Sequence, residues 1–202
     1  MIRNVVFDMG NVLMEFEPDK FIMNAGISDE RDMRVIRNEL FLSTEWISMD
    51  RGENDECDIE KTVLKRIPER LHESVSDILR NWHRKARIVP GMPEILQRLK
   101  EKGYRIFLLS NASHSQHLYW PRLGLQGYFD GTFISADTGV IKPMPEIYDR
   151  FITHFGLKEE ECIFIDDSPA NVETAIMLGW HGIVFHGDSS ELKQKLEEEG
   201  LL

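Results

Sequence analysis

Six polar or charged residues follow apolar segments of the chain or precede a helical one, where they could hold a cation and an anionic group. They are Asp8, Ser110, Asn111, Lys142, Asp166 and Asp167. Taken singly, such residues are commonly turn residues, helix caps or solvated charges. Together, the three carboxylates would repel one another, so a divalent cation is expected between them. Oxygen ligands without histidine or cysteine favour Mg²⁺ over zinc, and this cation calls for an anionic substrate.

The apolar segments before these residues are short and unbroken, as expected for parallel strands covered on both faces. We expect strands at 5–7, 105–110, 162–166 and 182–185, and helices at 92–103, 145–156 and 169–180. This alternation predicts an α/β fold with a doubly wound, mostly parallel, Rossmann-like sheet. Ligands bind outside the carboxyl ends of the strands in such a sheet, which is where the polar residues are expected.

Residues 16–87 break this rhythm, because they contain amphipathic helical segments and no convincing strand. A loop of that length is improbable inside a compact domain. We therefore predict a helical domain at 16–87, inserted after the first strand, and an α/β core domain formed by residues 1–15 and 88–202. Pro90 and Gly91 are interpreted as the return hinge into the core domain.

The composition excludes several classes of protein. Two widely separated cysteines, Cys57 and Cys162, form no metal-binding or redox motif. A net charge of −11 disfavours binding to nucleic acid. The first residues lack the apolar region of a signal peptide, and no window approaches the roughly 18 apolar residues of a membrane span. We expect a cytoplasmic protein without nucleic-acid or membrane partners.

The chain resembles the haloacid dehalogenase (HAD) superfamily of hydrolases over essentially its whole length. Four motifs carry the resemblance: FDMGNVL at 7–13, LSNAS at 109–113, IKPMPEIY at 141–148 and IDDSPANVETA at 165–175. The resemblance implies a HAD-like core with a helical cap that closes over the site, excludes water and selects the substrate. It also implies a phosphatase that hydrolyses small phosphorylated metabolites, with Mg²⁺ as cofactor, as a monomer or a homodimer.

The resemblance assigns a catalytic role to Asp8, which would attack phosphorus and form an aspartyl-phosphate. Ser110 and Asn111 would hold the phosphoryl oxygens, and Lys142 would neutralise charge shared by the nucleophile and the phosphate. Phosphoryl transfer needs an in-line nucleophile and cations for the equatorial oxygens, so this set suits the reaction.

The resemblance also assigns a set of metal ligands. Asp167 would bind Mg²⁺ directly, and Asp166 would act second or through water. Asp8 would supply another carboxylate oxygen, and Gly10 would supply its backbone carbonyl.

Gly10 is a departure from the family pattern, because most phosphatases of the superfamily carry a second aspartate at this position. That acid protonates the leaving oxygen, and general acid catalysis is typically worth about 10² to 10⁴ in rate. Three alternatives remain: a haloacid dehalogenase, a phosphate-binding or phosphoacceptor protein with little turnover, or a phosphatase whose leaving group departs with little protonation. The first motif and LSNAS…YWP most resemble the subgroup of α-D-glucose-1-phosphate phosphatase, which favours the third alternative and sugar 1-phosphates.

Other residues receive weaker predictions. Three residues of the helical domain could face the substrate: Trp46, Arg51 and Glu53. Alternatively, Trp46 could belong to the core of that domain, and Arg51 and Glu53 could form a solvated turn. His114 and His117 could replace the missing acid or bind metal, although ordinary helix-surface histidines are expected. A two-component receiver domain uses similar chemistry, but the helical insertion and the late position of the paired aspartates do not suit it.

Overall fold

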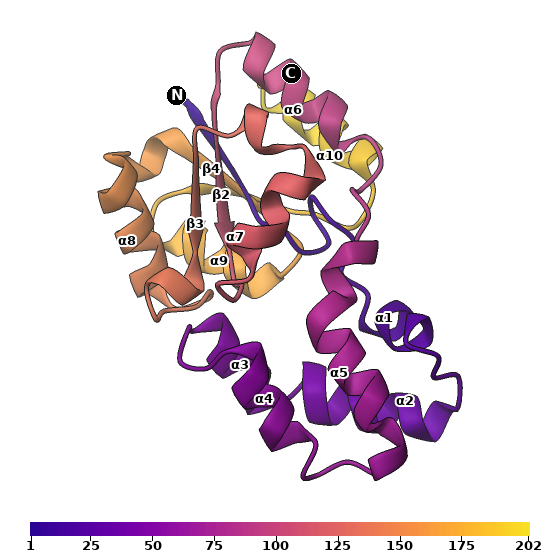
Figure 1. The fold of residues 1–202 in the computed structure, drawn as a ribbon. Helices are drawn as coiled ribbons and strands as arrows, with labels where there is room; N and C mark the ends of the chain where they lie inside the picture. Colours follow the sequence, from indigo (N-terminus) through magenta and orange to yellow (C-terminus); the bar gives the residue numbers. More distant parts are fainter.

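A parallel sheet of five strands in the order β3-β2-β1-β4-β5 forms the centre of the protein, in a computed structural model that describes residues 1–202 (Figure 1). The strands are β1 (Asn4–Phe7), β2 (Arg105–Ser110), β3 (Gly131–Ile134), β4 (Cys162–Asp166) and β5 (His181–Val184). This arrangement confirms the predicted α/β fold. β3 was missed because only its last two residues, Phe133 and Ile134, are apolar and buried, which is too short an apolar segment to be told from a loop.

Helices cover both faces of the sheet (Figure 1). They are α6 (Met92–Glu101), α7 (Gln116–Tyr119), α8 (Pro145–Phe155), α9 (Pro169–Met177) and α10 (Ser189–Glu198). Successive strand residues point to opposite faces, so Val5 and Phe7 pack with α6 and α10, while Val6 packs with α8 and α9. The strands therefore contribute buried side chains to apolar layers on both faces of the sheet. This explains why their apolar residues are consecutive in sequence rather than alternating with polar ones.

Five helices form a separate helical unit between β1 and α6 (Figure 1). They are α1 (Pro18–Asn24), α2 (Glu30–Ile36), α3 (Thr44–Asp50), α4 (Glu56–Val63) and α5 (His72–Asn81), with a π-helical turn at Arg37–Phe41. The unit has its own cluster of 14 buried apolar residues. Its entry and exit lie side by side, because Met14 and Ile88 pair in antiparallel fashion close to the predicted boundaries at residues 15 and 88.

No helix in the structure is both long enough and apolar enough to cross a lipid bilayer.

Candidate active site

The register of the sheet brings the acidic residues together. Phe7, the last residue of β1, pairs with Leu108 on one side and Ile165 on the other. The next residue, Asp8, therefore lies beside the end of β4, and its backbone N–H donates to the carbonyl of Ile165 at 2.9 Å. Carboxylate oxygens of Asp8, Asp166 and Asp167 all lie within 4.8 Å of one another. The predicted convergence of three carboxylates at one edge is present in the fold.

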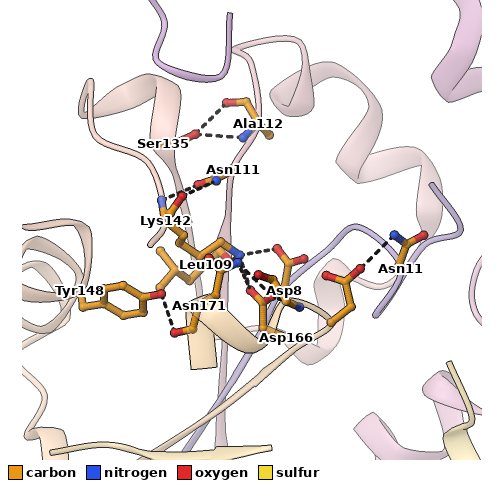
Figure 2. A network of polar contacts seen from close by, with 12 residues as sticks. Asp8, Asn11, Leu109, Asn111, Ala112, Ser135, Lys142, Tyr148, Asp166 and Asn171 are labelled. Atoms are coloured by element: carbon orange, nitrogen blue, oxygen red, sulfur yellow. Dashed lines mark hydrogen bonds and ion pairs between the residues drawn. The ribbon is translucent and has the colours of Figure 1, made fainter. Parts of the chain in front are cut away.

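Lys142 is the cation at the centre of this edge (Figure 2). Its buried ammonium group donates to Asp8 Oδ1 at 2.6 Å, to Asp166 Oδ2 at 2.7 Å and to the carbonyl of Leu109 at 2.9 Å. An ammonium group has three N–H donors, so all of them are used. Burial alone would lower the pKa of Lys142, but Asp8 and Asp166 together raise it above its ordinary value. The lysine is therefore held charged against the candidate nucleophile.

Asp166 is saturated with hydrogen bonds. Besides Lys142, it accepts from the backbone N–H of Ser168 at 2.8 Å and from the Asn171 amide, which reaches both carboxylate oxygens at 3.0 Å (Figure 2). Its side chain is fully buried. These contacts make Asp166 a residue that orients Lys142, and they leave Asp167 as the more available metal ligand of the pair.

Asn111 makes two reciprocal hydrogen bonds with the backbone of Lys142. Its Oδ1 accepts from the Lys142 N–H at 2.8 Å, and its Nδ2 donates to the Lys142 carbonyl at 3.0 Å. The side chain thus places Lys142, a task that the sequence did not suggest. Ser110 ends β2, lines the cavity described below and has no hydrogen-bond partner for its hydroxyl within the protein. Phosphoryl binding by Ser110 and Asn111 stays a prediction.

Asn11 supports Asp167 from the loop after β1. Its Nδ2 donates to Asp167 Oδ2 at 3.0 Å, and its Oδ1 accepts from the backbone N–H of Phe16 at 3.0 Å. Asn11 has a φ of 55°, in the left-handed region that asparagine tolerates better than most residues. Asn11 and Asn171 both lie in the motifs quoted above, but the sequence analysis gave neither a role. Nothing in the sequence indicated that Asn11 contacts Asp167, 156 positions away, or that Asn171 contacts Asp166, five positions away.

Burial controls the protonation of the carboxylates. It raises the pKa of Asp8 from 3.8 to about 7, although Lys142 acts in the opposite direction. Burial also raises the pKa of Asp167, against the hydrogen bond from Asn11. Both pKa values are raised because the ionised form of each carboxyl group is disfavoured when several carboxylates share one lysine in a poorly solvated place.

The donor set fits a hard divalent cation. Asp8 uses Oδ1 for Lys142, which leaves its Oδ2 free of that contact, and Asp167 uses only Oδ2 for Asn11. The backbone carbonyl of Gly10 accepts no hydrogen bond from the protein. One free oxygen is therefore available on each of three neighbouring residues, and Mg²⁺ prefers such oxygen ligands, completed by water and substrate oxygens.

A cavity of about 240 Å³ opens between the sheet edge and the helical unit. Asp8, Ser110, Lys142 and Asp167 line its floor. The opposite wall is aromatic and apolar: Met14, Phe16, Trp46, Met49, Trp82 and Tyr119. The rings of Phe16 and Trp82 pack edge to face with centroids 5.3 Å apart, and Trp82 packs in the same way on Tyr119 at 5.4 Å. This wall can contact the carbon skeleton of a small organic molecule.

Asp50, the last residue of α3, is the third acidic residue that lines the cavity. Burial and the charge of Asp8 raise its pKa to about 7, and Lys142 opposes this shift. Sequence analysis missed Asp50, because an aspartate at the end of an amphipathic segment carries no signal of facing a site on another domain.

The remaining predicted residues have mixed placements. Trp46 lines the cavity, whereas Arg51 and Glu53 do not. His114 and His117 lie outside it, with ring nitrogens 3.6 and 3.1 Å from Asp137 carboxylate oxygens. They pair with a surface acid, as the simpler interpretation expected.

The fold and the site define a doubly wound α/β protein that carries a carboxylate, a buried lysine and an acidic cluster at the carboxyl edge of its parallel sheet. The chain belongs to the haloacid dehalogenase-like hydrolases, whose family model matches residues 2–179. Flavin mononucleotide hydrolase 1 of Arabidopsis thaliana is 30% identical over 77% of this chain, and the match spans 62% of that protein's own length. A sesquiterpene phosphatase of Aspergillus oryzae is 27% identical over 90% of this chain and 88% of its own. A D-ribitol-5-phosphate phosphatase of Bacteroides thetaiotaomicron is 25% identical over 89% of this chain and 90% of its own.

Solved structures show the same fold. A HAD family enzyme from Bacteroides thetaiotaomicron, in complex with magnesium and inorganic phosphate, superposes with a TM-score of 0.73 at 22% identity, over 95% of this chain and 99% of that one. An L-2-haloacid dehalogenase from Xanthobacter autotrophicus superposes with a TM-score of 0.68 at 18% identity, over 100% of this chain and 85% of that one. The fold is thus shared by phosphate-binding and dehalogenating enzymes, so the two activities have to be distinguished by the residues of the site. The family and its phosphatase relatives are established, but membership of the glucose-1-phosphate phosphatase subgroup is not.

Proposed function

We propose that this hydrolase is a Mg²⁺-dependent phosphatase of small phosphorylated metabolites that works through an aspartyl-phosphate on Asp8. The observation that carries the proposal is the contact of 2.6 Å between Asp8 and the buried ammonium group of Lys142, beside an acidic cluster on a cavity floor. The named relatives support it, since they include phosphatases of flavin, polyol and terpenoid phosphates.

Each residue of the floor has a task in this reaction. One carboxylate oxygen of Asp8 would attack phosphorus while the other faces the cation, and Lys142 engages Oδ1. Lys142 stabilises the charge on the phosphoryl oxygens, and the Ser110 hydroxyl can donate to one of them. Asn111 and Asp166 hold Lys142 in position through its backbone and its ammonium group.

Asp8, Asp167 and the carbonyl of Gly10 would hold the cation, with Asp166 behind them. When bound, Mg²⁺ neutralises charge on the phosphoryl group and favours the ionised form of Asp8, whose pKa burial raises. The cation site is also the feature that sets a phosphatase apart from a dehalogenase, because displacement of halide from carbon involves no phosphoryl charge to neutralise.

We further infer that sugar 1-phosphates are the preferred substrates. Gly10 offers no acid at the position two residues after the nucleophile, so any proton must come from farther across the cavity, and substrates whose leaving group depends least on protonation should react fastest. An anomeric oxygen is such a leaving group. The aromatic wall, with Trp46 and Trp82, offers a surface for the apolar face of a sugar ring.

The first test is release of phosphate from p-nitrophenyl phosphate with and without Mg²⁺. The wild-type protein should turn over only with the metal, and Asp8→Asn should lose at least about 10⁴-fold in kcat, because it lacks the nucleophile. The proposal is wrong if Asp8→Asn keeps its turnover. Halide release from a 2-haloacid without metal would instead identify a dehalogenase.

Two further outcomes refine the assignment. Radiolabelled phosphate that stays on Asp8 without turnover would identify a phosphoacceptor protein. For an active phosphatase, the rate on a sugar 1-phosphate should exceed that on the 6-phosphate of the same sugar. Equal or reversed rates would remove the explanation offered for Gly10 while leaving the phosphatase assignment intact.

A further inference from the structure

The position two residues after the candidate nucleophile, Gly10, has no acidic side chain. A Cβ atom built at Gly10 would have Phe16 Cβ at 3.8 Å and Asp8 Oδ2 at 4.0 Å as its nearest neighbours. The position is therefore roomy enough for a side chain but contains none. Phe16 belongs to the cavity wall, and the same cavity is lined by Asp50 of the helical unit. An acid is thus absent from position 10 and present across the cavity.

Asp50 is held against the core by backbone contacts. Its carbonyl accepts a hydrogen bond from Ser135 Oγ at 2.5 Å, and the same Oγ accepts from the N–H of Ala112 at 2.9 Å. Ala112 follows the end of β2 by two residues. The anchor therefore ties the end of α3 to the edge of the sheet that carries the floor of the cavity.

Gly52 brings the chain after Asp50 even closer to the core. Its φ is +70°, and a Cβ built there would lie 2.4 Å from the carbonyl oxygen of Ala136 and 2.8 Å from His114 Cε1. No side chain fits in that contact, so glycine is required for the close approach. Both contacts fix where Asp50 stands relative to the floor.

The carboxyl group of Asp50 is free of competing partners. It makes no hydrogen bond and no ion pair with the protein, and only Asp8 and Lys142 exert a resolved charge effect on it. Burial and the charge of Asp50 raise the pKa of the Tyr119 hydroxyl, on α7, while His114, which lies beside Gly52, is paired with Asp137. Burial and Asp8 raise the pKa of Asp50 to about 7. A carboxylic acid that keeps its proton near neutral pH is suited to donate it.

We propose that Asp50 is the proton donor to the leaving oxygen, the role that Gly10 cannot fill. The proposal rests on the phosphatase function proposed above. As an oxygen of Asp8 bonds to phosphorus, the bond from phosphorus to the leaving oxygen breaks, and the proton of Asp50 passes to that oxygen. The Asp50 carboxylate then takes a proton from the water that attacks the aspartyl-phosphate. Inorganic phosphate leaves, and the carboxylate of Asp8 and the acid form of Asp50 are restored.

The test compares Asp50→Asn with the wild type on leaving groups of different basicity: 2,4-dinitrophenyl phosphate, p-nitrophenyl phosphate, phenyl phosphate and a sugar 6-phosphate. A dinitrophenolate needs no proton to depart, whereas a sugar alkoxide does. Asp50→Asn should therefore lose about 10² or more in kcat/KM on the sugar 6-phosphate, and less than about tenfold on dinitrophenyl phosphate. The preference for sugar 1-phosphate over 6-phosphate should widen in the variant.

The pH profile provides a second readout. The wild type should lose kcat/KM on the sugar 6-phosphate as the pH rises and Asp50 gives up its proton, and Asp50→Asn should lack this decline. Glu53→Gln is the matched control, since it removes a carboxylate three residues away that does not line the cavity. It should reproduce the wild-type dependence on leaving group and on pH.

The outcomes separate the two proposals. Equal losses on all four substrates, or an unchanged pH profile, would show that Asp50 is not the proton donor, while activity of the wild type on dinitrophenyl phosphate would leave the phosphatase assignment standing. An inactive wild type on dinitrophenyl phosphate with Mg²⁺ would reject the phosphatase assignment and this inference with it.

Discussion

Lys142 and Asp50 face the same cavity from opposite sides and have opposite environments. On the floor, the Lys142 ammonium group uses all three donors, and Asp166 accepts from three different residues. Across the cavity, the Asp50 carboxyl group has no hydrogen-bond or ion-pair partner, and the lining from the same helix includes Trp46 and Met49. The floor is therefore a rigid polar network that suits a fixed chemical step. The wall leaves the Asp50 carboxyl group and an apolar surface free to contact the leaving group, which is the part of the molecule that differs between phosphate esters.

This contrast also separates two uses of burial. On the floor, the cost of burying charge is offset by hydrogen bonds and opposite charge, so removal of one partner leaves the others uncompensated. In the wall, burial acts on an isolated carboxyl group and shifts its pKa upward. Variants on the floor should therefore cost both stability and activity, whereas variants in the wall should alter activity and pH dependence more than folding.

The largest effect on stability is expected from Lys142→Met. This change leaves Asp8 and Asp166 without their shared cation in a buried place, so we expect a loss of about 3 to 5 kcal/mol in the free energy of unfolding. The rate should fall by about 10² to 10³ because the phosphoryl charge loses its stabilising group. Urea unfolding and steady-state kinetics measure both. Lys100→Met is the control: it breaks a surface ion pair with Asp130 at 2.9 Å and should cost at most about 1 kcal/mol.

A smaller effect on the floor is expected from Asn171→Ala. The amide of Asn171 donates to both oxygens of Asp166, and hydrogen bonds to a charged group are worth about 1.5 to 3 kcal/mol. We expect a loss of stability in this range and a lower kcat. Tyr148→Phe removes only the hydrogen bond of 2.8 Å to the Asn171 carbonyl and should cost about 1 kcal/mol without lowering kcat. Matching kinetic losses in the two variants would contradict a specific role for the amide.

Asp50→Asn should change the pH dependence of stability. The pKa of Asp50 is about 7 in the folded protein and 3.8 ordinarily, so the folded state binds this proton more tightly. The native aspartate therefore opposes folding at pH values above about 7, and this penalty disappears as the pH falls below about 4. The variant should be more stable than the wild type by about 1 to 2 kcal/mol near pH 8, with no gain near pH 4. Metal-free thermal unfolding across this range measures the difference, and a gain that does not depend on pH would contradict the assigned shift.

The smallest effect is expected from Trp46→Leu in the wall. The substitution keeps an apolar side chain but removes ring contact with Phe16 and with the bound molecule. Aromatic contacts are worth about 0.5 to 1.5 kcal/mol, so KM should rise about 2- to 12-fold with little change in kcat. Ile47→Ala, on the exposed side of the same helix, should leave KM unchanged. A fall in kcat with constant KM would place Trp46 in the chemical step instead.

Much of the floor was predictable from the sequence. Three of the buried segments that end in polar residues are strands of one parallel sheet, so placing Asp8, Ser110 and Asp166 at strand ends was sufficient to bring them to one edge. The reciprocal bonds of Asn111 with Lys142 were not predictable, because they join residues 31 positions apart. β3 was not predicted because it begins with Gly131 and Thr132, so that only Phe133 and Ile134 form its apolar segment.

The wall was hardly predictable at all. Trp46 was one of three candidates from its segment, and the structure places only this one in the cavity, while Arg51 and Glu53 lie outside it. Which face of α3 turns toward the floor depends on how the helical unit packs on the core. That packing rests on contacts such as Ser135 with the Asp50 carbonyl, across 85 positions of sequence.

The sequence by itself determined the α/β fold, the helical insertion, the strand-end positions of Asp8, Asp166 and Asp167, and the place of Lys142 just before a helix. The reason is that hydrophobic periodicity is local and parallel strands share one carboxyl edge. Only the tertiary structure decided which side chains hold Lys142 in place and that Asp50 lines the same cavity as Gly10. The reason is physical: the anchors of Lys142 and Asp50 join distant segments, and their geometry arises when the helical unit and the sheet pack together.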